Sequence, residues 1–422
     1  MEIRAPHALL TPSPAAAESL SARYTRVRAV TCALAAPLSA EDAQAQSMPD
    51  ASPAKWHLAH TSWFFERFVL GTDPAFRPSH PEWHVLFNSY YRSVGRFHSR
   101  AARGLLTRPS LAEVLAWRDA VDARVLARLA GDGADDDLVM RVTLGINHEQ
   151  QHQELLLTDI KHLFASNPLK PIYHATPCAA SSAPAPLAFV AGPVGAQWIG
   201  AAGDAFSYDN EGPRHAEWLA PFALANRLLT NAEYREFIDA GGYRTPSLWL
   251  SDGWDHVERE GWTHPLYWSR DLSAEFTLSG ERALDPHAPV CHLSYYEADA
   301  CARWAGARLP REAEWEVMAA SAAVRGNLQE RGVFQPLAAT SGTPQFFGDV
   351  WEWTASAYLA YPGFTPLAGA FGEYNGKFMS GQMVLKGGSC VTPAEHIRAS
   401  YRNFFAPASR WQFMGLRLAR DA

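Results

Sequence analysis

Two histidines placed four residues apart, His148 and His152, are the side chains in this sequence best suited to share a metal ion. In an α-helix, side chains four positions apart leave the same face on neighbouring turns, so both imidazoles point in one direction. A pair of this kind is also compatible with two solvated or hydrogen-bonded histidines. The sequence therefore predicts a metal site only if another part of the chain supplies a third ligand.

The segment 56–66, WHLAHTSWFFE, contains two candidates for that third ligand, His57 and His60. His60 lies in the more apolar helical stripe, between aromatic side chains. A histidine held among aromatic rings is neutral and needs a partner, which suits a metal ligand. Either histidine is also compatible with a hydrogen-bonded place in a core, so both remain candidates at this point.

Two further polar residues of the segment NHEQQHQE at 147–154 lie close to the histidine pair. Gln151 projects from the flank of the histidine face and is placed to reach a molecule bound beside the metal. Glu154 falls far round the helix, which favours a role in orienting other groups over a role as a metal ligand.

Residues 19–164 have the periodicity of long amphipathic helices. Helices are expected from Leu20, after Pro53, over 111–129 and over 136–164, with a short one capped by Ser39. Four long helices with apolar stripes indicate a bundle, and bundles commonly hold metals between facing helices. The loop 73–108, between the second and third long helices, is long enough to indicate a functional role.

The composition indicates a folded protein with two domains. At 422 residues the chain exceeds one ordinary core, and its 47% hydrophobic and 19% charged residues exclude a disordered chain. Residues 166–186 are rich in Ala, Ser and Pro, which is typical of a linker. Beyond them the sequence turns to short strands and Trp-rich loops, with amphipathic helices at 231–240 and 295–305. We therefore expect an α-helical domain over 1–165 and an α+β domain over 187–422.

Charge, hydropathy and cysteine usage exclude several classes of protein. The formal net charge of −7, without a basic run, argues against a nucleic-acid partner. No segment reaches the roughly 20 apolar residues that cross a membrane. Residues 1–17 lack the pattern of a signal peptide, and five widely spaced cysteines without a CxxC motif predict reduced thiols in the cytoplasm. Small molecules are the expected partners, and the sequence specifies no oligomeric state.

Four motifs of the second half follow one another in a specific order: RLPREAEWE at 308–316, GDVWEWT at 348–354, GGS at 387–389 and GLR at 415–417. Together they resemble the formylglycine-generating-enzyme fold, a variant of the C-type lectin fold. His60 and the HxxxHxE motif at 148–154 resemble the DinB-like four-helix bundle. The combination resembles the ergothioneine-biosynthesis sulfoxide synthases (EgtB type) and their selenoneine synthase relatives (SenA type).

This resemblance implies a non-haem iron enzyme. The iron ligands of the family fall on His60, His148 and His152, which selects His60 over His57. The implied reaction is an Fe(II)- and O2-dependent oxidative coupling of a sulfur or selenium donor to C2 of the hercynine imidazole, giving a sulfoxide or selenoxide. Three neutral imidazoles leave the metal its full positive charge, which favours binding of a deprotonated thiol or selenol.

The resemblance also implies residues that bind hercynine. The glutamine that holds the substrate imidazole falls on Gln151, and the segment that surrounds the trimethylammonium group falls on Asn403, Phe404 and Phe405. Aromatic faces suit a quaternary cation, because it has no N–H to donate. The same three residues are also compatible with a strand that closes into a core.

The adjacent Tyr90 and Tyr91 match the active-site tyrosine pair of the cysteine-using branch, and one of them is expected to deliver a proton to reduced oxygen. In that branch the following loop reads VGPRHPR, whereas residues 94–100 read VGRFHSR and retain Arg100 as a carboxylate clamp. A second departure is FMSGQ at 378–382, where Cys-Asn is expected before Gln. Two donors therefore remain open: a cysteine-type thiol, and a selenosugar that has no α-carboxylate.

Two other classes of function fit parts of the pattern. A zinc-dependent DinB-type thiol transferase would use the same helical half without O2, and a lectin-like binding protein would retain only a vestigial metal site. Formylglycine generation is disfavoured, because the cysteine pair that holds copper in that activity has no counterpart. Cys390 stands alone before residues 391–405, which contain no cysteine.

Overall fold

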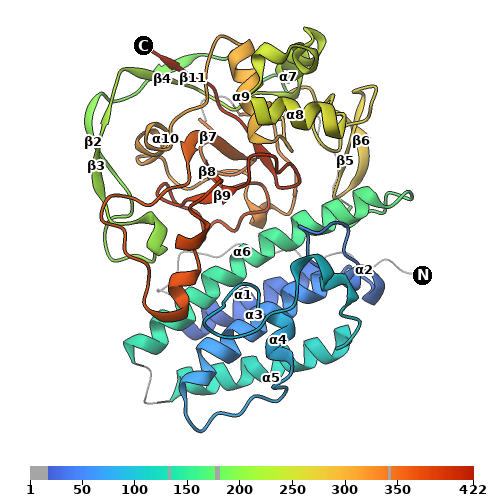
Figure 1. The fold of residues 1–422 in the computed structure, drawn as a ribbon, viewed down its shortest axis with the longest axis vertical. Helices are drawn as coiled ribbons and strands as arrows, with labels where there is room; N and C mark the ends of the chain where they lie inside the picture. The colour runs from blue at the N-terminus through green and yellow to red at the C-terminus, as the bar shows by residue number, and fades with distance from the viewer. Residues whose placement is uncertain (1–17, 132–134, 176–180, 341–343) are drawn as a thin grey trace.

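A computed structural model describes residues 18–131, 135–175, 181–340 and 344–422 (Figure 1). The chain forms two halves that lie against each other, with helices in the first half and small sheets with surrounding helices and loops in the second. The N-terminal residues 1–17 and Cys178, about which the sequence made predictions, lie outside the described residues. None of the described helices is long and apolar enough to cross a membrane.

The first half contains the four long helices that the sequence predicts, together with two short ones. In chain order these are α1 (Leu20–Ala35), α2 (Ala40–Gln44), α3 (Ala54–Phe68), α4 (Trp83–Phe87), α5 (Leu111–Ala130) and α6 (Asp136–Ser166). Helix α3 packs against α5 and α6, and α1 packs against α6. Every residue of α3 except Arg67 is buried, so this helix is the centre of the bundle.

Side-chain caps explain where several of these helices begin. Ser39 caps α2 and Ser110 caps α5, each in a reciprocal capping box with the acid three residues later. Asp135 accepts a hydrogen bond from the backbone N–H of Leu138, 2.8 Å away, and so begins α6. The predicted start of α3 after Pro53 is confirmed. Pro53 makes no side-chain cap, and its lack of an N–H costs nothing there, because N–H groups at a helix start have no partner within the helix.

A buried ionic cluster holds α6 in place beside the face that carries His148 and His152, the predicted metal-binding face. Glu149, next to His148, accepts hydrogen bonds from Thr31 at 2.6 Å and from Arg28 at 2.8 Å, and it also pairs with Arg118. Burial alone would raise the pKa of Glu149, but the two guanidinium groups lower it to about 2. This carboxylate therefore joins α1, α5 and α6, and it fixes the rotation of α6 about its axis.

Within its described residues, the second half is built from short strands arranged in four small sheets. The strands are β1 (Phe189–Ala191), β2 (Gly195–Ile199), β3 (His215–Leu219), β4 (Phe222–Ala225), β5 (Ala274–Thr277), β6 (Gly280–Ala283), β7 (Trp351–Ala357), β8 (Met383–Lys386), β9 (Asn403–Phe405), β10 (Met414–Gly415) and β11 (Ala419–Asp421). The four-stranded sheet has the order β10-β7-β8-β9, with β10 parallel to β7 and the other pairs antiparallel. The other sheets are β1-β4-β11, β2-β3 and β5-β6.

In the part of this half that the structure describes, four α-helices surround these sheets: α7 (Asn231–Asp239), α8 (Ser251–Glu260), α9 (Tyr295–Trp304) and α10 (Glu312–Ala319). Helices α7 and α9 correspond to the two helices that the sequence predicts in this half. The motif RLPREAEWE forms the start of α10, where Arg308 pairs with Glu314 at 2.7 Å. GDVWEWT leads into β7, where Glu352 pairs with the fully buried Arg417 of the GLR motif at 2.7 Å. The first ion pair lies within one motif, and the second holds the GDVWEWT and GLR motifs together.

Two segments that the sequence predicts as irregular make specific contacts. Within the expected linker, Tyr173 donates its hydroxyl to the main-chain oxygen of Leu34 at 2.6 Å and its N–H to that of Leu278 at 2.9 Å. The described part of this segment therefore contacts both halves. The long loop 73–108 contains α4 and the 3-10 helix Arg100–Leu105, which bring its side chains to the edge of the metal-binding face.

Glu154 of α6 joins the two halves. It accepts hydrogen bonds from Trp351 at 2.5 Å and Gln412 at 2.8 Å through one oxygen, and from Thr392 at 2.6 Å through the other. The expectation that Glu154 is not a metal ligand agrees with this geometry. Its side-chain hydrogen-bond partners among the described residues all belong to the second half, so this carboxylate orients the second half against α6.

Candidate metal centre

Three histidines from two helices meet at one buried point between α3 and α6. One ligand atom each of His60, His148 and His152 lies within 4.8 Å of the others. Their ring centroids are 4.6 to 5.0 Å apart. Among the described residues this is the one group of three or more His, Cys, Asp or Glu side chains with this geometry. The structure therefore brings together the three residues that the sequence proposes as metal ligands.

The orientation of His60 is determined by its surroundings. Its Nδ1 lies 2.6 Å from the main-chain oxygen of Phe87, which can only accept, so Nδ1 carries the proton. The imidazole is stacked between Trp56, at 4.5 Å and 13°, and Trp63, at 5.5 Å and 14°. Its Nε2 is buried and has no hydrogen-bond partner among the described residues. A buried lone pair without a partner is costly, and a metal ion would satisfy it.

Burial keeps all three imidazoles neutral. It lowers the pKa of His148 to about 3, and it lowers the pKa values of His60 and His152 well below the usual range. Repulsion between neighbouring imidazolium charges acts in the same direction on His60 and His152. Neutral imidazole is the form that binds a metal ion, so the cluster is ready to bind one at neutral pH.

His57, the other histidine of the WHLAH segment, does not join the cluster. It lies three residues before His60 on α3, and its Nδ1 is 2.8 Å from Nδ1 of His152 while its Nε2 is 3.0 Å from Asp159. Of the two candidates that the residues alone leave open, the structure thus brings His60 to the other two histidines and makes His57 a neighbour of one of them.

A cavity of about 490 Å³ opens beside the histidines and is lined by both halves of the chain. Gln151 lies in its wall, donates its amide N–H to the hydroxyl of Tyr401 at 2.5 Å and accepts a hydrogen bond from the hydroxyl of Tyr374. An amide has two N–H groups and two acceptor lone pairs. Gln151 therefore retains one donor and one acceptor for a molecule in the cavity.

Besides Tyr401, the tyrosines Tyr90, Tyr91 and Tyr374 lie near the metal-binding face, in different positions. Tyr90 lines the cavity, whereas Tyr91 stacks behind it at 4.7 Å and is enclosed by Trp63 and other aromatic rings, with no exposed surface. Tyr374 also lines the cavity, and its ring centroid is 5.6 Å from that of His148. Tyr374 was not predicted from the sequence, because it comes from a loop some 280 residues beyond Tyr90.

Strand β9 forms the opposite wall of the cavity. Asn403, Phe404 and Phe405 all line it and are partly buried. The ring of Phe404 is stacked on Tyr358 at 4.0 Å and 10°, and Phe405 meets Trp411 edge to face at 5.7 Å. These residues belong both to a strand and to the cavity wall, so the alternative of a closed core strand does not describe them.

Two arginines of the 3-10 helix Arg100–Leu105 reach the cavity, and only one of them was expected. Arg100 lines it from an exposed position. Arg103 is buried, donates to Ser52 at 2.8 Å and Ser89 at 3.0 Å, and lies 3.3 Å above the ring of Trp56. Burial lowers its pKa to about 8, and no carboxylate forms an ion pair with it among the described residues. Its spacing of three from Arg100 was the available signal.

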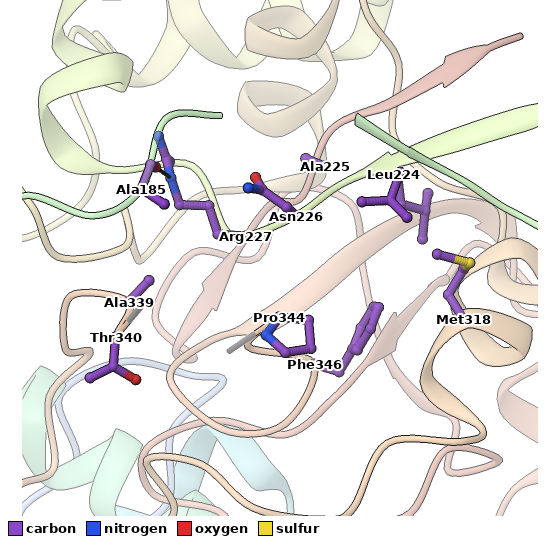
Figure 2. A pocket seen from close by; sticks show the side chains of 11 residues that line it. Ala185, Leu224, Ala225, Asn226, Arg227, Met318, Ala339, Thr340, Pro344 and Phe346 are labelled. Atoms are coloured by element: carbon purple, nitrogen blue, oxygen red, sulfur yellow. Dashed lines mark hydrogen bonds between the residues drawn. The ribbon is translucent and has the colours of Figure 1, made fainter. Parts of the chain in front are cut away.

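A second cavity, of about 300 Å³, lies in the second half and has a different character (Figure 2). It is lined mostly by apolar side chains such as Leu224, Met318 and Phe346. Its one charged lining residue, Arg227, is already paired with Glu233 at 2.7 Å. Among its described lining residues there is no His, Cys, Asp or Glu.

Known proteins match this chain over nearly its whole length. The DinB superfamily matches residues 23–163, and the sulfatase-modifying factor enzyme 1-like domain matches residues 180–336 and 331–422. The "Hercynine oxygenase" of Mycolicibacterium smegmatis is 33% identical over 407 residues, which cover 89% of this chain and 92% of that protein. This chain belongs to the hercynine oxygenase family.

Further relatives agree with this placement. The "Hercynine oxygenase" of Mycobacterium tuberculosis is 32% identical, over 96% of this chain and 99% of that protein. The "Formylglycine-generating enzyme" of Streptomyces coelicolor is 32% identical over 146 residues, which cover 31% of this chain and 44% of that enzyme. As a member of the hercynine oxygenase family the chain is an enzyme, an oxidoreductase. The family and the two-part fold that the sequence predicts are confirmed.

Proposed function

We propose that this chain catalyses the O2-dependent coupling of a sulfur or selenium donor to C2 of the hercynine imidazole. For a thiol, one S–H and one C2–H are lost, a C–S bond forms, one oxygen atom stays on sulfur and the other leaves as water. The observation that carries the proposal is the buried, unpartnered Nε2 of His60, which faces two further neutral histidines at the wall of a cavity. The membership in the hercynine oxygenase family supports the choice of hercynine.

We assign the metal to the three histidines. His60, His148 and His152 would hold Fe(II), and the neutral, nitrogen-only ligand set suits a divalent transition metal. When bound, Fe(II) supplies the redox chemistry for O2 reduction and a positive charge that favours the thiolate or selenolate form of the donor. Trp56 and Trp63 exclude water from the far side of His60.

We assign the hercynine site to the cavity walls on either side of the histidines. The free donor and acceptor of the Gln151 amide are suited to the imidazole of the substrate. Phe404 and Phe405 offer aromatic faces to the trimethylammonium group, and Asn403 lies next to them on the same strand. This arrangement would hold C2 of the imidazole near the metal-binding face.

We propose that a tyrosine of the cavity delivers the proton to reduced oxygen. Burial raises the pKa values of Tyr90, Tyr91 and Tyr374, so all three hydroxyls stay protonated at neutral pH. Tyr90 and Tyr374 line the cavity, and Tyr91 supports Tyr90 from behind. The proposal therefore extends the tyrosine pair expected from the sequence to a third residue from the second half.

We propose two donors, a cysteine-type thiol and a selenosugar. The positive charges of Arg100 and Arg103 at one end of the cavity suit a donor with a carboxylate. Arg103 also donates to two serine hydroxyls, which is the kind of contact that sugar hydroxyls would replace. We further propose that the enzyme acts in the cytoplasm, where its thiols would stay reduced. The four cysteines within the described residues are all free.

The test is oxygen uptake by the purified enzyme after anaerobic loading with Fe(II) or Zn(II). Hercynine would be supplied with cysteine, a cysteine-containing thiol or a selenosugar, and the products would be analysed by mass spectrometry. We expect O2 uptake and a C–S or C–Se product with Fe(II) only. Transfer without O2 by the Zn(II)-loaded enzyme would instead support a thiol transferase. If no donor is turned over with either metal, the result would support the lectin-like binding protein instead.

A further inference from the structure

A chain of buried polar groups continues from the metal-binding face into the protein. The Nδ1 atoms of His152 and His57 are 2.8 Å apart, and Nε2 of His57 is 3.0 Å from Oδ2 of Asp159. The same Oδ2 accepts the main-chain N–H of Ser52 at 2.8 Å. All these side chains are buried, so water does not compete for these contacts.

The donors and acceptors in this chain can be assigned one after another. A main-chain N–H always donates, so Oδ2 of Asp159 is an acceptor, and Nε2 of His57 must carry the proton that it donates. A neutral imidazole has one proton, so Nδ1 of His57 is an acceptor. Nδ1 of His152 must then carry a proton to donate, and the lone pair of His152 lies on Nε2.

We propose that Asp159, acting through His57, holds His152 in the tautomer whose Nε2 binds the metal. This makes His57 and Asp159 positioning residues, in the way that a main-chain oxygen positions His60. The role differs from the ligand role that the sequence left open for His57. The inference rests on the proposed function, because it needs His152 to be a ligand.

The same series of hydrogen-bonded groups also links the proposed metal centre to the cavity wall. Ser52, which holds Asp159 by its main-chain N–H, accepts a hydrogen bond from Arg103 through its hydroxyl at 2.8 Å. Arg103 in turn covers Trp56, which stacks on His60. The positions of two proposed ligands, His60 and His152, therefore depend on one connected group of residues from α3, the residue Ser52 before it, the 3-10 helix Arg100–Leu105 and α6.

The first measurement is the tautomer of each histidine in the metal-free enzyme, from two-bond ¹H–¹⁵N correlation spectra. The proposal predicts that His152 is protonated at Nδ1 and His57 at Nε2. In His57→Leu, which removes the acceptor, His152 should populate both tautomers. His152 protonated at Nε2 in the unsubstituted enzyme would overturn the proposal.

The second measurement is Co(II) affinity, followed by the visible absorption of the bound ion. Loss of an outer partner of a ligating histidine typically costs roughly 10- to 100-fold in metal affinity, and we expect a loss in this range for His57→Leu. His57→Asn places an amide oxygen near the position of Nδ1, so it should recover most of the affinity. Binding to His57→Leu as tight as to the unsubstituted enzyme would contradict the proposal.

A matched control and a check of folding complete the experiment. His162 lies on α6, as His152 and Asp159 do, and its side chain hydrogen-bonds to Ser47 at 2.7 Å, so it takes no part in the hydrogen bonds from Asp159 to His152. His162→Gln should therefore bind Co(II) normally. Thermal unfolding of each metal-free variant separates a lost positioning contact from a lost fold. If the unsubstituted enzyme binds no metal, the proposed function fails, whereas the tautomer spectra still decide whether Asp159 and His57 orient His152.

Discussion

His60 donates its Nδ1 proton to the main-chain oxygen of Phe87 over 2.6 Å, so its Nε2 faces His148 and His152. This single contact joins the long loop 73–108 to the metal-binding face, because Phe87 ends the short helix α4 of that loop. The loop therefore helps to orient His60 toward the other two histidines, in addition to contributing residues to the cavity wall.

The first prediction concerns metal content. Removing one of three ligands, in His60→Ala, should lower Fe(II) affinity by about a hundredfold or more, because loss of even an outer partner costs 10- to 100-fold. Metal analysis after anaerobic loading and desalting measures the effect. His84→Gln is a suitable control, because His84 bonds to Glu66 away from the cluster. Equal metal content in His60→Ala and the control would mean that the metal binds elsewhere.

The second prediction separates the three tyrosines. Tyr374→Phe and Tyr90→Phe remove hydroxyls at the cavity and should lower the yield of coupled product per O2 consumed, with more simple oxidation of the donor, because general acid catalysis typically contributes about 10²- to 10⁴-fold. Tyr91→Phe should keep most of the coupling, since its side chain is enclosed behind Tyr90. The ratio of coupled product to oxidised donor is the readout. Full coupling in both cavity variants would remove Tyr90 and Tyr374 from the mechanism.

The third prediction concerns hercynine binding. Gln151→Leu removes the amide that is available to the substrate imidazole and should raise the KM for hercynine about tenfold, or roughly 1.4 kcal/mol. The neighbouring Gln150 bonds to Glu395 instead, so Gln150→Ala is a matched control. Steady-state kinetics at saturating donor measure the change. An unchanged KM in Gln151→Leu would place the imidazole elsewhere in the cavity.

The fourth prediction concerns the dependence of stability on pH. Burial raises the pKa of Asp349 to about 6 from 3.8, despite hydrogen bonds from Asn327, Gln345 and Leu337. A raised pKa means that the folded state holds this proton more tightly than the unfolded state. Its contribution is therefore present below pH 4 and is lost as the pH rises to about 6, a change of about 3 kcal/mol at 1.36 kcal/mol per pH unit.

Asp349→Asn tests this directly, because asparagine also tolerates the left-handed backbone of this position, at φ 59°. The variant should lose less stability than the unsubstituted protein between pH 4 and pH 6. Chemical denaturation at a series of pH values gives the two curves. Parallel curves over that range would show that Asp349 does not hold its proton more tightly in the folded state.

The fifth prediction concerns the contact between the two halves. Trp351→Phe removes the indole N–H that donates to Glu154 and leaves a buried carboxylate oxygen with one partner fewer, which should cost about 1–3 kcal/mol. Trp353→Phe removes a similar bond to Leu293 inside the second half. Both variants should lose stability, but only Trp351→Phe should increase hydrogen exchange in α6. Equal exchange of α6 in the two variants would argue against a role of Glu154 in joining the halves.

The sequence by itself determined the helical pair His148 and His152, the starts of α2, α5 and α6, with Ser39 as the cap of α2, and the family. These features depend on neighbours along the chain: helical spacing places two imidazoles on one face, and a cap lies within three residues of the helix that it begins. The order of the four motifs in the second half is likewise visible without coordinates.

Residue spacing left His57 and His60 open, and only the family resemblance favoured His60; the physical reason for the difference lies in the tertiary structure, because both residues are buried on α3. Their roles differ because Phe87 reaches one of them and Asp159 of α6 reaches the other. The places of Tyr374 and Arg103 were also decided by the approach of segments far apart in the chain. Propensity and periodicity describe contacts between near neighbours, whereas a site built from two halves depends on how those halves pack.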